Sequence, residues 1–431
     1  QATGTAGTKA PAAVNGSTTA FSTATDTIDV MVGTPNTAPN FIAGNGIAIN
    51  LESFGTDLRA YGIALQSDGK IIAVGTASNT THSFALARYN VDGTLDNSFG
   101  SGGVVITNFA GGPHSYAYKV TVQSDGRIVA VGYTLVSGTP RYAVARYNPD
   151  GTLDTSFNGT GMVTTAFGPG PDIANDVIVQ PDGKIVAVGS SNGRFSAARY
   201  NRDGSLDTSF NTTGLVTTSF ASTALAVAGA LQSDGKLVLV GYSSSNGNDI
   251  CVARYTTAGV LDTTFNGTGI YTLASSGDDS GMSVAVQSDG KIVVGGSLAS
   301  GNCDYALLRL TSTGALDTSF GNNGIVTADV AGGIDLGESV TLQSDGKIVL
   351  VGASSDHTTV LRYNANGTLD TSFGGTGIVT TPTSDLFDWG YSVVVQPDGH
   401  VVVGGTSLAD WGFSFEVLRY NSNGTLDTSF G

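Results

Sequence analysis

The sequence Gln-(Ser/Pro)-Asp-Gly-(Lys/Arg/His) occurs seven times, with consecutive copies 52 to 57 residues apart. The copies begin at Gln66, Gln123, Gln180, Gln232, Gln287, Gln343 and Gln396. A period of this length indicates one supersecondary unit that is copied along or around an architecture. Because a unit of this size cannot bury its apolar faces alone, its neighbours must stack on it. We therefore expect one repeat array, although 431 residues would ordinarily suggest two or three domains.

Each copy of the motif lies between two short apolar runs. In the fifth copy, residues 283–287 precede Ser-Asp-Gly and residues 291–296 follow it. Two β-branched runs separated by a turn signal predict a hairpin. Pro181 and Pro397 hold φ at about −65°, which excludes a type I′ turn and fits the second position of a type I turn. The glycine after the aspartate then takes a left-handed bulge position.

Two further strands complete each copy. The second strand is apolar throughout, as in 71–74, which indicates that both of its faces are covered. A glycine ends this strand in every copy, at Gly75, Gly132, Gly189, Gly241, Gly296, Gly352 and Gly405. A third strand such as 84–89 leads to Gly-x-Leu-Asp-x-(Ser/Thr)-Phe, and a fourth apolar run such as 377–381 follows. Four short antiparallel strands per copy predict a propeller blade, with a solenoid as the alternative.

The two ends of the array favour a closed ring. The seventh copy stops at Gly431 before its fourth strand, whereas residues 46–50 precede the first hairpin without a copy of their own. We interpret this N-terminal strand as the one that completes the seventh blade, because a solenoid would carry polar caps instead. The fold prediction is an all-β, seven-bladed β-propeller over residues 41–431, with four antiparallel strands per blade. A low-complexity arm rich in Ala, Thr and Gly precedes it over residues 1–40.

The repeated segments resemble a known bacterial family. They read Val-x-(Leu/Val)-Gln-Ser-Asp-Gly-Lys-Ile-x-x-Val-Gly and then Ala-Arg-Tyr-Asn-x-Asp-Gly-Thr-Leu-Asp-Thr-Ser-Phe-Gly. Both are similar to the delta-60 repeat of secreted and cell-surface proteins, and the resemblance spans about residues 46 to 431. It implies a β-propeller, and it implies no reaction and no catalytic residues.

The composition argues against several classes of partner. Charged residues make up 13% of the chain, the net charge is −16, and 13 of the 19 Lys and Arg residues stand at fixed repeat positions. Nucleic acid and anionic membrane are therefore poor partners, since both need clustered basic residues. No stretch approaches the roughly 18 apolar residues of a membrane span. The low charge, the Ser, Thr and Asn content and the start at Gln1 without Met predict an extracellular or bacterial cell-surface protein.

Seven arginines of the third strand match seven aspartates of the Leu-Asp motif one to one. The arginines are Arg88, Arg146, Arg199, Arg254, Arg309, Arg362 and Arg419, and the aspartates are Asp96, Asp154, Asp207, Asp262, Asp317, Asp370 and Asp427. A ring of charge for ligands is one interpretation. Strict repetition favours the other, in which each blade holds a buried or half-buried structural Arg–Asp pair, either within the blade or bridging adjacent blades.

The sequence contains no clear metal or cofactor motif. The turn from Asn90 to Asp96 resembles an oxygen-rich calcium loop, but the Asp92 position is Ala258 in a later copy, so an Asx turn is expected. Calcium near Asp278 and Asp279 stays open as an alternative to no cofactor at all. The four histidines, His82, His114, His357 and His400, lie in different copies without metal-ligand spacing. For Cys251 and Cys303 two free thiols are expected, with a disulfide as the alternative.

Function is expected where the repetition stops. Two loops per copy vary in length, and the chain direction places both on one face of the ring. In the seventh copy these loops hold both tryptophans with three carboxylates: Trp389, Trp411, Asp385, Asp388 and Asp410. Aromatic faces beside carboxylates suit the CH faces and hydroxyl groups of sugars. Packing of these aromatic side chains beneath the loops, or against the N-terminal arm, is the alternative.

These patterns predict an extracellular binding or structural module without catalytic activity, which presents its variable loops to a glycan or protein partner. A self-assembling cell-surface or filament subunit that uses the N-terminal arm is the second interpretation. A carbohydrate-active propeller enzyme is the third, because a nucleophile elbow, a phosphate loop and an HExxH helix are all missing from the sequence.

Overall fold

The computed structural model describes residues 47–50, 57–78, 81–109, 114–244, 247–274, 277–299, 302–383, 387–409 and 412–431. Contacts between residues divide the chain into Gln1–Ala38 and Pro39–Gly431, and every described residue belongs to the second unit. The arm predicted over residues 1–40 lies outside the described residues. Within the described ranges, no helix is long and apolar enough to cross a bilayer.

The described residues form 28 strands in seven sheets. The first three sheets contain β2 (Asp57–Leu65), β3 (Ile71–Ser78), β4 (His82–Tyr89) and β5 (Val104–Thr107); β6 (Ser115–Val122), β7 (Ile128–Val136), β8 (Thr139–Tyr147) and β9 (Met162–Thr165); and β10 (Asp172–Val179), β11 (Ile185–Ser191), β12 (Arg194–Tyr200) and β13 (Leu215–Thr218). The next two contain β14 (Thr223–Leu231), β15 (Leu237–Ser244), β16 (Asn248–Tyr255) and β17 (Ile270–Leu273); and β18 (Ser280–Val286), β19 (Ile292–Ala299), β20 (Cys303–Leu310) and β21 (Ile325–Ala328). The last two contain β22 (Asp335–Leu342), β23 (Ile348–Ser354), β24 (His357–Tyr363) and β25 (Ile378–Thr381); and β26 (Phe387–Val395), β27 (Val401–Ala409), β28 (Gly412–Tyr420) and β1 (Ile47–Asn50).

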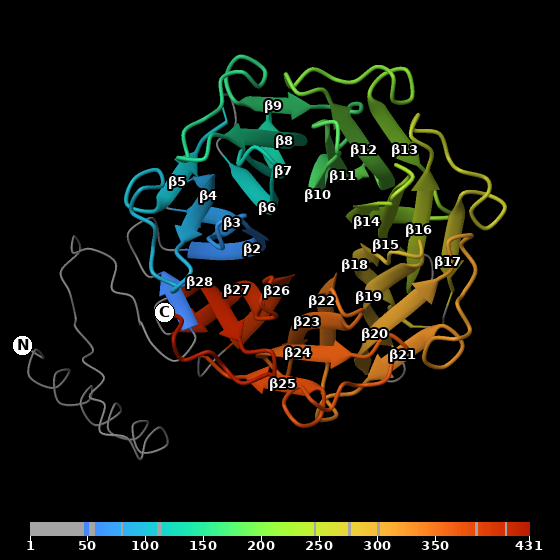
Figure 1. The fold of residues 1–431 in the computed structure, drawn as a ribbon. Helices are drawn as coiled ribbons and strands as arrows, with labels where there is room; N and C mark the ends of the chain where they lie inside the picture. Colours follow the sequence, from blue (N-terminus) through green and yellow to red (C-terminus); the bar gives the residue numbers. More distant parts are fainter. Residues whose placement is uncertain are drawn as a thin grey trace, which may run out of the picture. The chain divides into compact units, whose positions relative to one another are not determined.

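These sheets are the seven blades of a closed β-propeller (Figure 1). The first strand of each sheet lies innermost, next to the ring axis. In the seventh blade the strand order is β1-β28-β27-β26, and Ile47 pairs with Leu418. The N-terminal strand therefore completes the last blade, as the missing fourth strand of the seventh copy predicts.

The Gln-x-Asp-Gly segments form the predicted turns between the first and second strands of each blade. The Gly69 N–H donates to the Gln66 carbonyl at 3.0 Å, and the φ angle of Gly69 is 84°. In all seven copies this glycine has a φ between 81° and 90°. A left-handed glycine at the end of a type I turn gives the chain reversal without a β-carbon clash.

The second strands are longer than the sequence suggests. They do not end at the glycine but continue for two to four residues, as β3 does beyond Gly75. The glycine has a different role, because the inner strand has a β-bulge opposite it, between Ala60 and Gly62 in the first blade. A β-carbon at Gly75 would overlap the Arg59 carbonyl, and the equivalent overlap recurs in all seven blades.

Apolar packing occurs at the seven boundaries between blades. Each of the seven hydrophobic clusters combines residues of two adjacent blades. At the boundary between the last and first blades, Val402 and Phe430 pack with Ile71 and Tyr89. Every blade therefore depends on two neighbours, which explains why the ring is the stable unit.

An arginine in each blade connects three structural parts. Arg199 Nε lies 2.7 Å from Asp207 Oδ2, its Nη1 donates to the Thr257 carbonyl of the next blade at 2.7 Å, and its guanidinium lies over the Phe210 ring. The same arrangement recurs in every blade, and in the last one Arg419 donates to Val91 of the first. The side-chain relative exposures of the seven arginines lie between 4% and 9%. These pairs thus lie within and between blades, away from solvent.

The strand directions define two faces of the ring. The turn face carries the Gln-x-Asp-Gly turns and the Leu-Asp corners. The loop face carries the connection from second to third strand and the connection from one blade to the next. Contacts between these two connections confirm that they share a face, for example Asn302 Nδ2 donating to the Gly333 carbonyl at 2.6 Å.

Candidate functional site: an aromatic arc around the ring axis

A continuous series of aromatic contacts runs across blades 7, 1 and 2. Successive ring centroids lie 4.7 to 5.9 Å apart. We call this series the aromatic arc; in contact order it consists of Phe387, Trp389, Tyr391, Tyr61, Tyr118, Tyr133, Tyr116, His82 and His114. All nine side chains are half-buried. They therefore combine mutual packing with surface that a ligand can contact.

The inner-strand bulge positions the central members of the arc. Tyr61, Tyr118 and Tyr391 are the residues that the bulge leaves unpaired in β2, β6 and β26. A bulge reorients a side chain relative to regular alternation. Blades 3, 4 and 5 have Asn175, Val227 and Met282 at this position. The aromatic side chains at the bulge are thus confined to one sector of the ring.

The sixth blade contributes a carboxylate to the end of the arc. Glu338 is the bulge residue of β22 and is half-buried. Burial raises the pKa of Glu338 to about 8, and the facing indole N–H of Trp389 opposes that rise. Burial and then the charge of Glu338 raise the pKa of Tyr391, while Arg59 lowers it. An acid, an arginine and two aromatic rings therefore lie together around Tyr391.

Two histidines meet at the other end of the arc. The Nδ1 atoms of His82 and His114 lie 3.0 Å apart, and the His82 ring stacks on Tyr116 with centroids 4.7 Å apart. These histidines belong to neighbouring copies, so their spacing in the chain carries no sign of their contact. The arc thus has an imidazole pair at one end and a carboxyl group at the other.

The structure describes two of the five residues predicted to bind a ligand. Trp389 lies within the inner strand β26 rather than in a loop, and it stacks on Tyr391 at 5.5 Å. Asp388 is fully buried, and its carboxylate accepts from the Thr383 N–H at 2.7 Å and the Ser407 hydroxyl at 2.8 Å. Asp385, Asp410 and Trp411 lie outside the described residues.

The positions considered for calcium differ in their surroundings. Asp92 Oδ1 accepts from the N–H and hydroxyl of Thr94, which is the predicted Asx turn. Asp278 Oδ1 accepts from the Asn248 N–H at 3.0 Å. Among the described residues, one group of carboxylates has the spacing of metal ligands: Asp304, Asp329 and Asp335. Cys251 and Cys303 are both free, as expected.

A hollow lies on the turn face, away from the arc. It has a volume of about 910 Å³ and lies along the ends of the inner strands of blades 2, 3 and 4. Its arginines already have partners, since Arg127 and Arg146 both contact Asp154, at 2.9 and 2.7 Å. The hollow therefore offers few uncommitted polar groups, and the arc is the stronger candidate site.

Solved structures with the same fold include enzymes. A catalytically inactive virginiamycin B lyase from Staphylococcus aureus with quinupristin matches at a TM-score of 0.53 and 13% identity, over 86% of this chain and 98% of that chain. A streptogramin B lyase matches at 0.51 and 14%, over 86% and 97%. A puromycin hydrolase matches at 0.50 and 15%, over 92% of this chain and 57% of that chain. No curated protein sequence matches.

These structures correct one prediction. The inference that the protein is not an enzyme is wrong, because propellers that match most of this chain include two lyases and a hydrolase. The missing catalytic motifs misled the inference, since a propeller assembles a site from side chains of several blades and needs no contiguous motif. At 13 to 15% identity the likeness extends to the fold alone.

The repeats themselves match a family by sequence. The matched residues are 66–99, 123–157, 180–210, 232–265, 287–320, 343–373 and 396–430, which together make up more than half of the chain. Each match begins at the glutamine of the turn and ends at the phenylalanine of the Leu-Asp motif. The matches cover the scaffold and leave out seven of the nine arc residues, whereas His82 and Tyr133 lie within them. The protein belongs to the family described as "Domain of unknown function (DUF5122) beta-propeller".

Proposed function

We propose that the aromatic arc binds a glycan on the loop-face half of the ring axis, in an extracellular setting. The observation that supports this most is the unbroken run of nine half-buried rings, which exists in blades 7, 1 and 2. Tyrosine and tryptophan combine an apolar face with a polar tip, which matches the alternation of CH groups and hydroxyls on a sugar.

The polar groups beside the arc suit the same ligand. Glu338 and Arg59 flank Tyr391, so a hydroxyl-rich ligand would meet an acceptor and a donor at one end. The two adjacent histidines would offer further donors and acceptors at the other end. A few polar groups that orient a ligand against a mostly apolar surface are typical of small-molecule sites.

The test uses a glycan array followed by titration calorimetry with the glycans that bind. Replacing Tyr116 with Leu should weaken binding roughly tenfold, because a lost aromatic contact is worth ~1.4 kcal/mol. Tyr271 is a matched control, since it is a half-buried tyrosine on the outer strand β17, and Tyr271→Leu should bind normally. Equal binding by Tyr116→Leu and the unaltered protein would contradict the proposal.

A second candidate function is acid–base catalysis on the bound saccharide, and the environment of Glu338 favours it. A carboxyl group whose pKa is raised to about 8 is protonated at neutral pH and can donate a proton to a leaving oxygen. Glycans that bind should be incubated with the protein and examined for shortened chains. If cleavage occurs, Glu338→Gln should slow it at least about 100-fold while binding persists. Unchanged cleavage by this variant would remove Glu338 from the reaction.

A further inference from the structure

On the loop face, a cationic group lies at the boundary between blades 2 and 3. Arg141 Nη1 donates to the carbonyls of Gly168 and Gly170 at 2.8 and 2.7 Å and to Asp172 Oδ2 at 2.8 Å. Asp172 is fully buried, and the same oxygen accepts from the Phe167 N–H at 3.2 Å. The blade-to-blade loop and the start of the next inner strand thus place three oxygen atoms around one positive charge.

The boundary between blades 5 and 6 has the same backbone arrangement. The loop from Ala328 to Asp335 has the same length as the loop from Thr165 to Asp172. The Val330 N–H donates to Asp335 Oδ2 at 2.6 Å, in the same way that Phe167 donates to Asp172. Asp335 therefore holds the position of Asp172, at the first residue of its inner strand.

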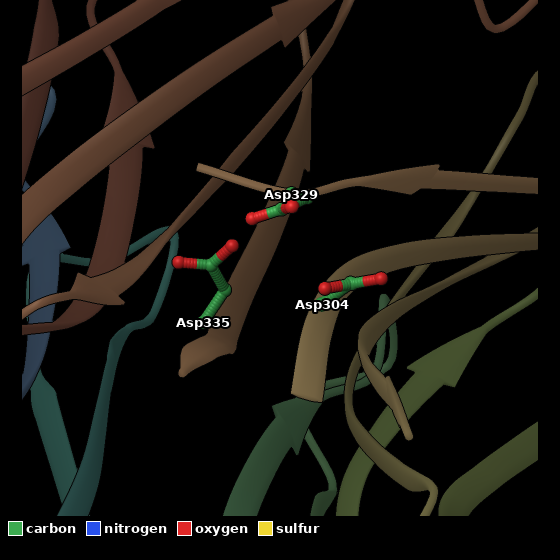
Figure 2. Close-up of side chains that lie close together, drawn as sticks. All are labelled: Asp304, Asp329 and Asp335. Atoms are coloured by element: carbon green, nitrogen blue, oxygen red, sulfur yellow. The ribbon is translucent and has the colours of Figure 1, made fainter. Parts of the chain in front are cut away.

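At this boundary, the position equivalent to Arg141 holds a carboxylate instead of a positively charged side chain. Arg141 directly precedes Tyr142, which pairs with Thr165, and Asp304 directly precedes Tyr305, which pairs with Ala328. Asp304 thus replaces the arginine. The loop adds another acid, Asp329, and the ligand atoms of the three carboxylates lie within 4.8 Å of one another. Figure 2 shows them around one space.

One of these oxygens is buried without a hydrogen bond from the described residues. Asp335 is 0% exposed, and its Oδ1 has no donor there, as is also true of Asp172 Oδ1. The Ser354 hydroxyl donates to the Val330 carbonyl at 3.2 Å. The difference between the two boundaries is the charge beside the buried aspartate: Asp172 has Arg141, whereas Asp335 has two further carboxylates. Three carboxylates this close together indicate a missing cation.

A third boundary supports the same interpretation. Between blades 6 and 7, His357 holds the Arg141 position and its Nδ1 lies 3.8 Å from Asp388 Oδ2. The Thr383 N–H donates to that oxygen at 2.7 Å. Two of these three equivalent boundaries therefore pair the buried aspartate with a side chain that can carry positive charge, whereas at the boundary between blades 5 and 6 no described residue forms such a pair with Asp335.

We propose that a calcium ion binds between blades 5 and 6 through Asp304, Asp329 and Asp335, in the position that the Arg141 guanidinium takes between blades 2 and 3. Carboxylate and backbone carbonyl oxygens are the ligands that Ca²⁺ prefers. The carbonyls equivalent to those of Gly168 and Gly170 belong to Ala331 and Gly333. A site with several protein oxygens suits Ca²⁺ better than Mg²⁺, which keeps most of its waters.

The test measures binding of Ca²⁺, and separately of Mg²⁺, to the EDTA-treated and desalted full chain by titration calorimetry. We expect Ca²⁺ to bind with a Kd of about 10⁻⁵ to 10⁻³ M and to raise the melting temperature by about 3 °C or more. Asp329→Asn should weaken Ca²⁺ binding at least about tenfold. Asp203 is the matched control, since it is an exposed aspartate at a Leu-Asp corner on the turn face and the sixth copy has Asn366 at the equivalent position, so Asp203→Asn should bind Ca²⁺ normally.

A charge reversal gives an independent readout. Asp304→Arg reproduces the arrangement of Arg141 with Asp172, so this variant should lose the Ca²⁺ response and melt in EDTA no lower than the unaltered protein. Three results would overturn the proposal: no binding of Ca²⁺, tighter binding of Mg²⁺ than of Ca²⁺, or equal loss of Ca²⁺ affinity in Asp203→Asn and Asp329→Asn. If Asp304→Arg does not fold, the two asparagine variants still decide the question.

Discussion

The guanidinium of Arg419 donates a hydrogen bond to the backbone carbonyl of Val91, which joins the last blade to the first. The same boundary is closed by the Gly431 N–H, which donates to the Asp92 carbonyl at 2.7 Å. It is also closed by the Ser392 hydroxyl, which accepts from the Ile63 N–H at 3.3 Å. Ring closure therefore uses the same kinds of contact as the other six boundaries.

Removing one of these arginines should destabilise the ring. In Arg254→Leu the buried Asp262 loses the partner at 2.8 Å, and the Ser312 carbonyl loses its donor. We expect a loss of about 3 kcal/mol in the free energy of unfolding, since the more distant Lys236 is then the one positive partner that the described residues give this buried charge. Chemical denaturation measures this loss. Arg194→Leu, at an exposed position, is the control, and an equal effect of both changes would refute the pairing argument.

Stability should fall as the pH rises, because of a buried glutamate. Burial raises the pKa of Glu416 to about 8, against 4.5 as its ordinary value. A raised carboxyl pKa gives stability that is complete below pH 4.5 and is lost as the pH rises through 8. Glu416→Gln should remove that loss, which is at most about 5 kcal/mol at pH 9. Melting temperatures of both proteins at pH 5, 7 and 9 test this, and parallel curves would contradict it.

The second-strand glycine should not tolerate a methyl group. In Gly241→Ala the new β-carbon would overlap the Leu225 carbonyl on the adjacent bulged strand. We expect failure to fold, or a loss of more than about 3 kcal/mol, because backbone on both sides resists movement. Gly168→Ala adds the same atom where nothing lies within 4 Å. Soluble yield and circular dichroism should separate the two variants, and similar behaviour would show that the strands can separate.

The two thiols should react at different rates. Cys251 is fully buried and its Sγ donates to the Ser243 hydroxyl at 3.3 Å, whereas Cys303 is half-buried. Burial raises the pKa of both thiols. A thiol-specific reagent should therefore label Cys303 first, slowly at neutral pH and faster as the pH rises. Mass spectrometry of partly labelled protein identifies the site, and earlier labelling of Cys251 would mean that its blade opens.

Local turn chemistry made the scaffold predictable. The turn that begins at Gln66 is encoded by five consecutive residues, and the number of its copies, seven, equals the number of blades. The pairing of Ile47 with Leu418 followed from counting strands. The bulge at Tyr61 was not predicted, because the extra residue shifts the alternation of inward and outward side chains by which a strand is recognised in a sequence.

The site could not be predicted to the same extent, because it combines residues of different blades. His82 and His114 are separated by 32 positions and meet only once two blades pack. One signal was present: the residue five positions before the glutamine is tyrosine at Tyr61, Tyr118 and Tyr391 and aliphatic or polar in the other copies. A comparison of the seven copies at that position would have identified these three tyrosines as arc residues in addition to Trp389.

The carbonyls that accept from the seven arginines belong to residues that share no side-chain property. They are Pro149, Arg202, Thr257, Ser312, Ala365, Ser422 and Val91. Each blade thus recognises the next by main-chain atoms, which every amino acid provides. A gene segment that encodes one blade could be duplicated, deleted or exchanged without a matching change in its neighbour at this contact. Such a ring can recombine its parts and still close.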